Sequence, residues 1–170
     1  MVVHYIYFPQ IKADVAESRH PTLARRPIAL IRGVGGDALV TARTSTAARL
    51  GVLVGMSAGS AQARAPRCAF LPDREEERME LLEEIAAAIA RDGCGVADIG
   101  EDFVAVHAGT LVEVGRVVAA AHLDQLAPRV SWRIAAGASV TDAREAAQTA
   151  RRTGVATFSA LVEVTLPLAG

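Results

Sequence analysis

The segment from Asp73 to Gly93 constrains the fold most, because it is the clearest amphipathic helix in the chain. Asp73 and Glu76 have the spacing of a capping box, and Gly93 follows the last apolar position as a C-terminal cap. The apolar positions recur at helical spacing, at Met79, Leu82, Ile85, Ala86 and Ile89. This helix must bury its apolar stripe against other elements, so the elements around it set the fold class.

Beyond this helix the chain alternates between strand patterns and helix patterns. The expected elements are strands over 95–99 and 103–107, a helix over 111–127, a strand over 130–139 and a helix over 141–154. The order is therefore αββαβα, and a first strand over 1–8 can join the same sheet. This order predicts an α+β domain with a ferredoxin-like split βαβ arrangement, and we expect its helices on one face of the sheet.

The sequence before the amphipathic helix over 73–93 predicts shorter elements. They are a helix over 9–19, strands over 26–33 and 37–42, two short helices within 44–66 and a strand over 68–72. The run from Gly33 to Asp37 joins two of these strands, which predicts a hairpin with glycines at positive φ. These glycines resemble a phosphate-binding loop only superficially, because such a loop opens a helix and here a strand follows.

Composition indicates an ordinary globular chain. Its 170 residues are 51% hydrophobic and 22% charged, which is enough to bury a core. No apolar run approaches the roughly 18 residues of a membrane span, and the N-terminus has no leader pattern, so we expect a cytoplasmic protein. Cys68 and Cys94 lie outside any metal-ligand spacing, as do the four histidines. We therefore expect reduced cysteines, no metal and no cofactor.

The net charge of −1 hides a strong asymmetry along the chain. Residues 18–72 hold eight arginines and one acid, a charge of +7, whereas residues 73–124 hold thirteen acids and four arginines, a charge of −9. A segment rich in arginine and poor in acid is typical of phosphate contact, because Arg binds phosphate through two donors and stays charged. The alternative is a solvated arginine surface balanced by the acidic helix, and the sequence leaves both open.

Several segments together resemble the palm and fingers of a Y-family translesion DNA polymerase. Residues 20–30 (HPTLARRPIAL) look like the entry to the fingers, and the run Ala48–Met56 (ARLGVLVGM) looks like the fingers signature. Residues 95–104 (GVADIGEDFV) occupy the place of the family's Ser-Ile-Asp-Glu turn. The resemblance implies a palm-like domain over 1–24 and 69–170, with a small fingers-like subdomain over 25–68.

The same resemblance implies that the catalytic carboxylates are lost. Y-family enzymes use carboxylates to hold two divalent ions for nucleotidyl transfer. Tyr7, Pro9 and Gly100 fall on three of these positions, and Glu101 is the sole carboxylate retained. We therefore expect no catalytic residues and a pseudoenzyme. A residual metal-dependent nucleotidyltransferase that uses Glu101 with Asp98 or Asp102 stays open as an alternative.

The branch that tolerates such losses is the ImuB-like one, whose members resemble inactive polymerases that act as adaptors in SOS-induced mutagenesis. This similarity implies a nucleoid-associated adaptor that binds DNA weakly through Arg43, Arg49, Arg64 and Arg67. Its implied protein partners are a sliding clamp, an accessory polymerase or a recombinase-like protein.

The C-terminus holds a short peptide that is similar to a ligand of the sliding clamp. Leu166, Pro167 and Leu168 would be its contact residues, although the same residues align with the loop that follows a palm. A further alternative is an assembly module without DNA binding, in which the palm-like face mediates homo-oligomer formation.

Overall fold

The computed structural model describes residues 2–23, 25–108 and 130–149, and these form two compact units. Unit 1 combines Met1–Pro9 with Met79–Gly170, and unit 2 is the continuous segment Gln10–Arg78. Unit 2 contains all of the predicted fingers-like range together with the elements on either side of it. The assignment of the predicted ranges to a palm and to fingers stays a prediction.

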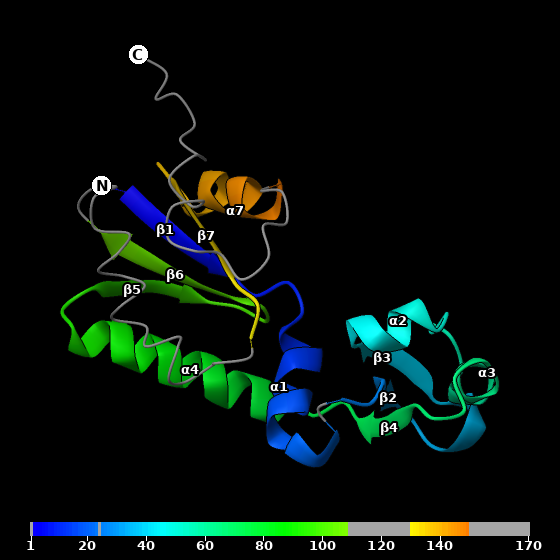
Figure 1. Cartoon of the computed structure of the whole chain (residues 1–170). Coiled ribbons are helices and arrows are strands. Elements are labelled where there is room, and N and C mark those ends of the chain that lie inside the picture. The colour runs from blue at the N-terminus through cyan, green and yellow to red at the C-terminus, as the bar shows by residue number, and fades with distance from the viewer. Residues whose placement is uncertain (1, 24, 109–129, 150–170) are drawn as a thin grey trace. The chain divides into compact units, whose positions relative to one another are not determined.

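Unit 1 contains a four-stranded antiparallel sheet (Figure 1). Its strands, in spatial order, are β5 (Gly95–Ile99), β6 (Phe103–Ala108), β1 (Val2–Tyr7) and β7 (Arg133–Gly137). The N-terminal strand β1 is central, because it pairs with β6 on one side and with β7 on the other. The predicted α+β class is confirmed, and so is the expectation that the first strand joins this sheet.

Helix α7 (Val140–Thr149) packs on one face of this sheet. Val3 and Tyr5 of β1 form a buried cluster with Ala143 and Ala147 of the helix. The helix approaches closely because β7 ends at Gly137, where a Cβ atom would lie only 2.5 Å from the Ala143 nitrogen. Small residues on both elements therefore set the depth of this contact.

The opposite face of the sheet is also buried, which corrects the expectation that the helices share one face. Val3, His4, Tyr5 and Ile6 of β1 are all buried, and successive side chains of a strand point to opposite faces. Figure 1 shows α4 (Glu75–Arg91) along the side of the sheet away from α7. Helix α4 contributes its predicted apolar stripe to the core, including fully buried Leu82, Ile85 and Ile89.

Unit 2 contains a three-stranded mixed sheet. Strand β2 (Ile28–Arg32) pairs antiparallel with β3 (Leu39–Arg43) and parallel with β4 (Ala69–Pro72). The other elements of this unit are α1 (Ile11–Arg19), α2 (Ser45–Arg49), α3 (Ala58–Arg64) and the short 3-10 turns η1 (Pro21–Leu23) and η2 (Gly35–Asp37). The predicted glycine hairpin is confirmed, with φ of 106° at Gly33 and 70° at Gly35.

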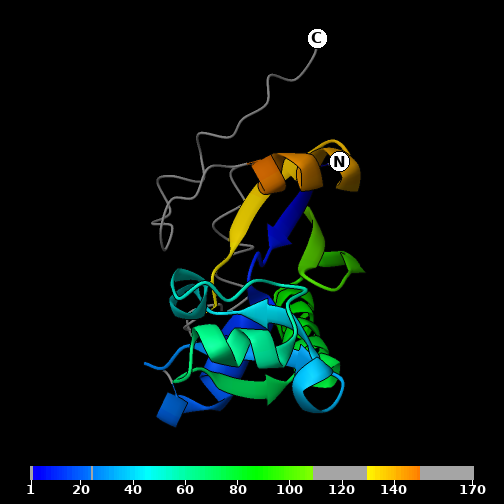
Figure 2. The ribbon, with the colours of Figure 1, turned by 90° about the vertical axis from the view of Figure 1, so that its right-hand side faces the viewer.

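Both faces of the unit 2 sheet carry an apolar cluster. Ala29 and Val40 pack with Ala47 and Ala61 on the side of α2 and α3. Ile28 and Leu30 lie on the other side, where they pack with Ala16 of α1. Figure 2 shows α3 in front of this sheet and α1 behind it. Among the described residues of the chain, no helix is long and apolar enough to cross a membrane.

Candidate functional site

The four positions of the expected carboxylate frame lie at one end of the unit 1 sheet. Tyr7, the last residue of β1, is directly opposite Phe103, the first residue of β6. The Phe8 amide continues this pairing by donating to the Asp102 carbonyl at 2.8 Å. Strand pairing therefore brings the end of β1 next to the turn that contains Gly100 and Glu101.

Gly100 occupies a position with no room for a side chain. Its amide donates to the Phe103 carbonyl at 3.0 Å, which closes the tight turn between β5 and β6. A Cβ atom at position 100 would overlap the ring of Phe103, and that ring also stacks on Tyr5 at a centroid distance of 4.5 Å. An aspartate at position 100 would require the Phe103 ring to move. The turn has aromatic packing where the family resemblance implies a metal ligand.

The acidic residues around this turn do not form a metal cluster. Glu101 is exposed, and Asp98 accepts a hydrogen bond from the Ile99 amide at 2.9 Å. Within the described ranges, no group of three or more His, Cys, Asp or Glu side chains is placed to hold a metal ion. Glu101 therefore does not belong to a group of this kind among the described residues.

Tyr5 carries the clearest electrostatic perturbation in this region. Its side chain is fully buried, and its hydroxyl has no hydrogen-bond partner among the described residues. Burial, followed by the negative charge of Asp102, raises the pKa of Tyr5 to about 12. Asp98 also raises it, and Arg144 of α7 opposes these effects. Asp98 and Tyr5 both pair with Ala105, so they share the face that carries α7.

The four predicted DNA-binding arginines all belong to unit 2, and the structure brings the side chain of Arg64 to the turn that follows Arg49. Arg64, at the end of α3, donates to the Gly51 carbonyl at 3.4 Å, only two residues beyond Arg49 at the end of α2. Arg67 follows on the exposed segment before β4. Arg43 is half-buried, and its Nε atom has no partner within the described part of the chain.

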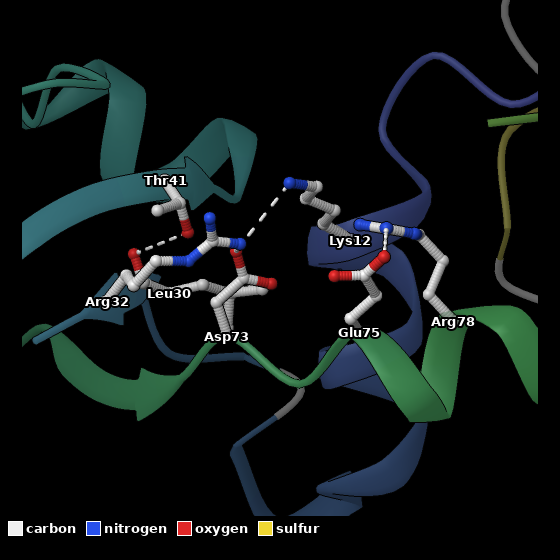
Figure 3. A network of polar contacts seen from close by, with 7 residues as sticks. All are labelled: Lys12, Leu30, Arg32, Thr41, Asp73, Glu75 and Arg78. Carbon is white, nitrogen blue, oxygen red and sulfur yellow. Dashed lines mark hydrogen bonds and ion pairs between the residues drawn. The ribbon is translucent and has the colours of Figure 1, made fainter. Parts of the chain in front are cut away.

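Four other cations of unit 2 are paired with carboxylates, and Figure 3 draws three of them, Lys12, Arg32 and Arg78. Lys12 of α1 and Arg32 of β2 both contact the Asp73 Oδ2 atom, at 3.6 and 3.3 Å. Arg74 pairs with Glu77 and Arg78 with Glu75, at 3.3 and 3.6 Å. By contrast, Arg43, Arg49, Arg64 and Arg67 form no ion pair with any described residue.

The Asp73 contacts correct the expected helix start. Helix α4 begins at Glu75, so Asp73 lies two residues before it and its carboxylate binds side chains of α1 and β2. The capping-box spacing gave no sign of this role, because both partners lie far away in the sequence. The predicted clamp-binding residues Leu166, Pro167 and Leu168 lie outside the described residues.

The sequence matches a known family over most of its length. The model of the impB/mucB/samB family matches residues 6–142. The chain belongs to this family. None of the curated proteins matches the chain. The matched range includes the end of β1, the whole of unit 2 and the turn around Gly100, so Tyr7, Pro9, Gly100 and Glu101 all fall inside the family match.

Solved structures place this impB/mucB/samB member on a Y-family polymerase fold. The post-insertion binary complex of Dbh DNA polymerase has a TM-score of 0.74 at 17% identity, covering 95% of this chain and 50% of the other. A Y-family DNA polymerase chimera has a TM-score of 0.73 at 16% identity and covers 89% of this chain and 47% of its own. DinB from Sulfolobus solfataricus has a TM-score of 0.69 at 18% identity, with coverages of 89% and 46%. The chain thus spans about half the length of these structures. Its fold is therefore similar to that of Y-family DNA polymerases.

Proposed function

We propose that this chain is a non-catalytic, DNA-binding adaptor of translesion synthesis, related to the ImuB-like branch. The observation that carries the proposal is the contrast between two sets of residues. The catalytic positions hold Tyr7, Pro9 and Gly100, while four arginines of unit 2 are without carboxylate partners among the described residues. The chain retains the polymerase-like frame and the basic surface, but not the ligands for two metal ions.

The loss of catalysis is supported by the chemistry of the replacements. Neither a phenol nor a proline ring binds Mg²⁺, which prefers carboxylate and carbonyl oxygens in a near-octahedral arrangement. Gly100 adds no ligand, and the ring of Phe103 fills the space beside it. Glu101 alone would supply one carboxylate where two ions need several, so nucleotidyl transfer has no support at this end of the sheet.

DNA binding is supported by the arginines that have no carboxylate partner among the described residues. Arg64 donates to the Gly51 carbonyl and Arg49 is exposed at the end of α2, so their guanidinium groups can neutralise phosphates without first breaking an ion pair. A complex of this kind gains affinity from the release of counterions, so it weakens steeply as salt is added. The adaptor would join this DNA contact to a protein partner at the nucleoid, such as a sliding clamp contacted through Leu166, Pro167 and Leu168.

The decisive experiment measures binding to a labelled primer–template across a salt series, with and without Mg²⁺ and nucleotide. We expect affinity that falls with salt and is indifferent to Mg²⁺ and nucleotide. Alanine at Arg49 or Arg64 should weaken binding and reduce the salt slope by about one each. Arg74→Ala is the matched control, because Arg74 is exposed but already paired with Glu77. Binding that requires Mg²⁺ and nucleotide would contradict the proposal and favour a residual nucleotidyltransferase.

A second candidate function, a protein-assembly module, has one observation in its favour. The large apolar side chains that are exposed among the described residues all belong to unit 2: Val34, Leu39, Leu50, Leu53 and Val54. Val34 is 93% exposed and Val54 56%, and exposed apolar groups of this kind mark protein contacts. If this function holds, the mass in solution rises with concentration, Leu53→Asp abolishes the rise, and DNA binding is absent.

A further inference from the structure

We propose that Asp73 withholds Lys12 and Arg32 from DNA, so that the phosphate-binding surface of unit 2 is confined to the side of α2 and α3. This inference rests on the proposed DNA-binding function and adds to it the location of the contact. It also assigns Asp73 a role that its place before a helix does not indicate. The argument starts from two cations that converge on one buried oxygen atom.

The two cations come from separate elements of unit 2. Lys12 lies in the first turn of α1, and Arg32 is the last residue of β2. Both contact the same oxygen, Oδ2 of Asp73, and the closer nitrogen is Nη2 of Arg32 at 3.3 Å. Figure 3 shows the two side chains reaching this carboxylate from opposite directions. One buried carboxylate of unit 2 therefore pairs with two cations of the same unit.

Burial makes this anion difficult to displace. The Asp73 side chain is 2% exposed, whereas those of Lys12 and Arg32 are 29% and 66% exposed. The Asp73 amide also donates to the Ile31 carbonyl at 2.9 Å, which fixes its backbone beside β2. A phosphate that approaches from solvent meets two cations whose charge is already compensated by the buried Asp73 carboxylate. Since the carboxylate cannot leave, the phosphate gains little from either cation.

The side of unit 2 that carries α2 and α3 has no such anion among the described residues. Arg43 pairs in register with Ala29, whose side chain packs on the side of α2 and α3. Arg49 and Arg64 end these two helices, and none of the three has a carboxylate partner among the described residues. Asp73 thus compensates Lys12 and Arg32, whereas Arg43, Arg49 and Arg64 on the side of α2 and α3 have no such anion among the described residues.

The test compares single variants in the same primer–template assay on the full chain. Asp73→Asn should tighten DNA binding by roughly threefold to tenfold near 0.1 M salt and steepen the salt slope by about one. Lys12→Ala and Arg32→Ala should each change the affinity by less than about twofold, whereas Arg49→Ala and Arg64→Ala should weaken it by roughly threefold or more. Thermal unfolding of each variant accompanies the assay.

The outcomes separate this inference from the proposed function. If the unsubstituted chain does not bind DNA, the proposed function fails. If it binds DNA but Asp73→Asn weakens binding, or Lys12→Ala and Arg32→Ala weaken it as much as Arg49→Ala, the inference is wrong and the Asp73 cluster is part of the DNA contact. If Asp73→Asn does not fold, the comparison of Lys12 and Arg32 with Arg49 and Arg64 decides by itself.

Discussion

At the scale of single residues, the turn around Gly100 shows how packing decides which residue fits at one position. Gly100 does not need glycine for its backbone conformation, because its φ is not among the positive values of the described glycines. It needs glycine because the Phe103 ring occupies the place of a side chain. The packing of Phe103 thus excludes a side chain at position 100 unless the ring moves.

The close packing of Gly100 and Phe103 predicts an energetic coupling between these two residues. Gly100→Ala should lower the free energy of unfolding by about 1–3 kcal/mol, because the added methyl group overpacks the Phe103 ring. In a Phe103→Ala background the same substitution should cost much less. Urea unfolding of the two single variants and the double variant measures the coupling. An equal cost in both backgrounds would show that the ring is not the obstacle.

Tyr5 predicts a dependence of stability on alkaline pH. Its pKa in the folded chain is about 12 and its ordinary value is 10.0, so folding favours the neutral phenol. The resulting stabilisation is fully present below about pH 10 and is lost as the pH rises through about 12. Tyr5→Phe should flatten this part of the stability profile. Denaturant unfolding at several pH values between 9 and about 12 checks it, and an unchanged profile would exclude Tyr5 as the cause.

At the scale of elements, α4 shows how a helix end is fixed by one residue. Gly93 has φ of 81°, and its amide donates to the Ala90 carbonyl at 3.1 Å. The Cys94 amide donates to the Ile89 carbonyl at 3.2 Å, which completes a Schellman motif. The predicted cap at Gly93 is therefore confirmed. The chain turns sharply here and enters β5.

The motif predicts different costs for two neighbouring glycines. Gly93→Ala should lower the unfolding free energy by about 1 kcal/mol, because a side chain is strained at positive φ. Gly95→Ala is the matched control, since its Cβ atom would make an ordinary contact of 3.7 Å with the Cβ atom of His107. Thermal or urea unfolding distinguishes the two, and equal effects would contradict the role of φ.

Most elements of this chain could be predicted from local sequence, and the exceptions have one physical cause. The helices, the cap at Gly93 and the hairpin at Gly33 depend on residues close in sequence, so local patterns predicted them. The contacts of Asp73 with Lys12 and Arg32 join three separate elements, and no local spacing encodes them. Phe103 lies only three residues from Gly100, but its ring stacks on Tyr5 of β1, a contact between distant segments that no local pattern encodes.

At the scale of the whole molecule, unit 2 is an insertion between two parts of unit 1. Unit 2 is one continuous segment, Gln10–Arg78, whereas unit 1 joins Met1–Pro9 to the chain after Arg78. Unit 2 also has its own sheet, with an apolar cluster on each face. Inserted segments with their own core often fold alone.

We therefore predict that a fragment of residues 10–78 folds without the rest of the chain. Its circular dichroism should show helix and strand, and it should unfold cooperatively, with marginal stability because so small a domain buries little surface. The fragment should also bind DNA with the salt dependence of the full chain. A fragment that is unfolded in isolation would show that unit 2 depends on unit 1 for its stability.

The position of β1 has a consequence for synthesis. This central strand is synthesised before unit 2, whereas its partners β6 and β7 are synthesised after unit 2. Val2 therefore cannot pair with β6 until Ala108 has been made, and Val3 cannot pair with β7 until Gly137 has been made. On the ribosome, unit 2 can complete its contacts while the apolar strand beside it still lacks both neighbours. A chain halted before residue 103 would carry a folded insertion next to an unpaired strand in the sequence, a state exposed to chaperones and to aggregation.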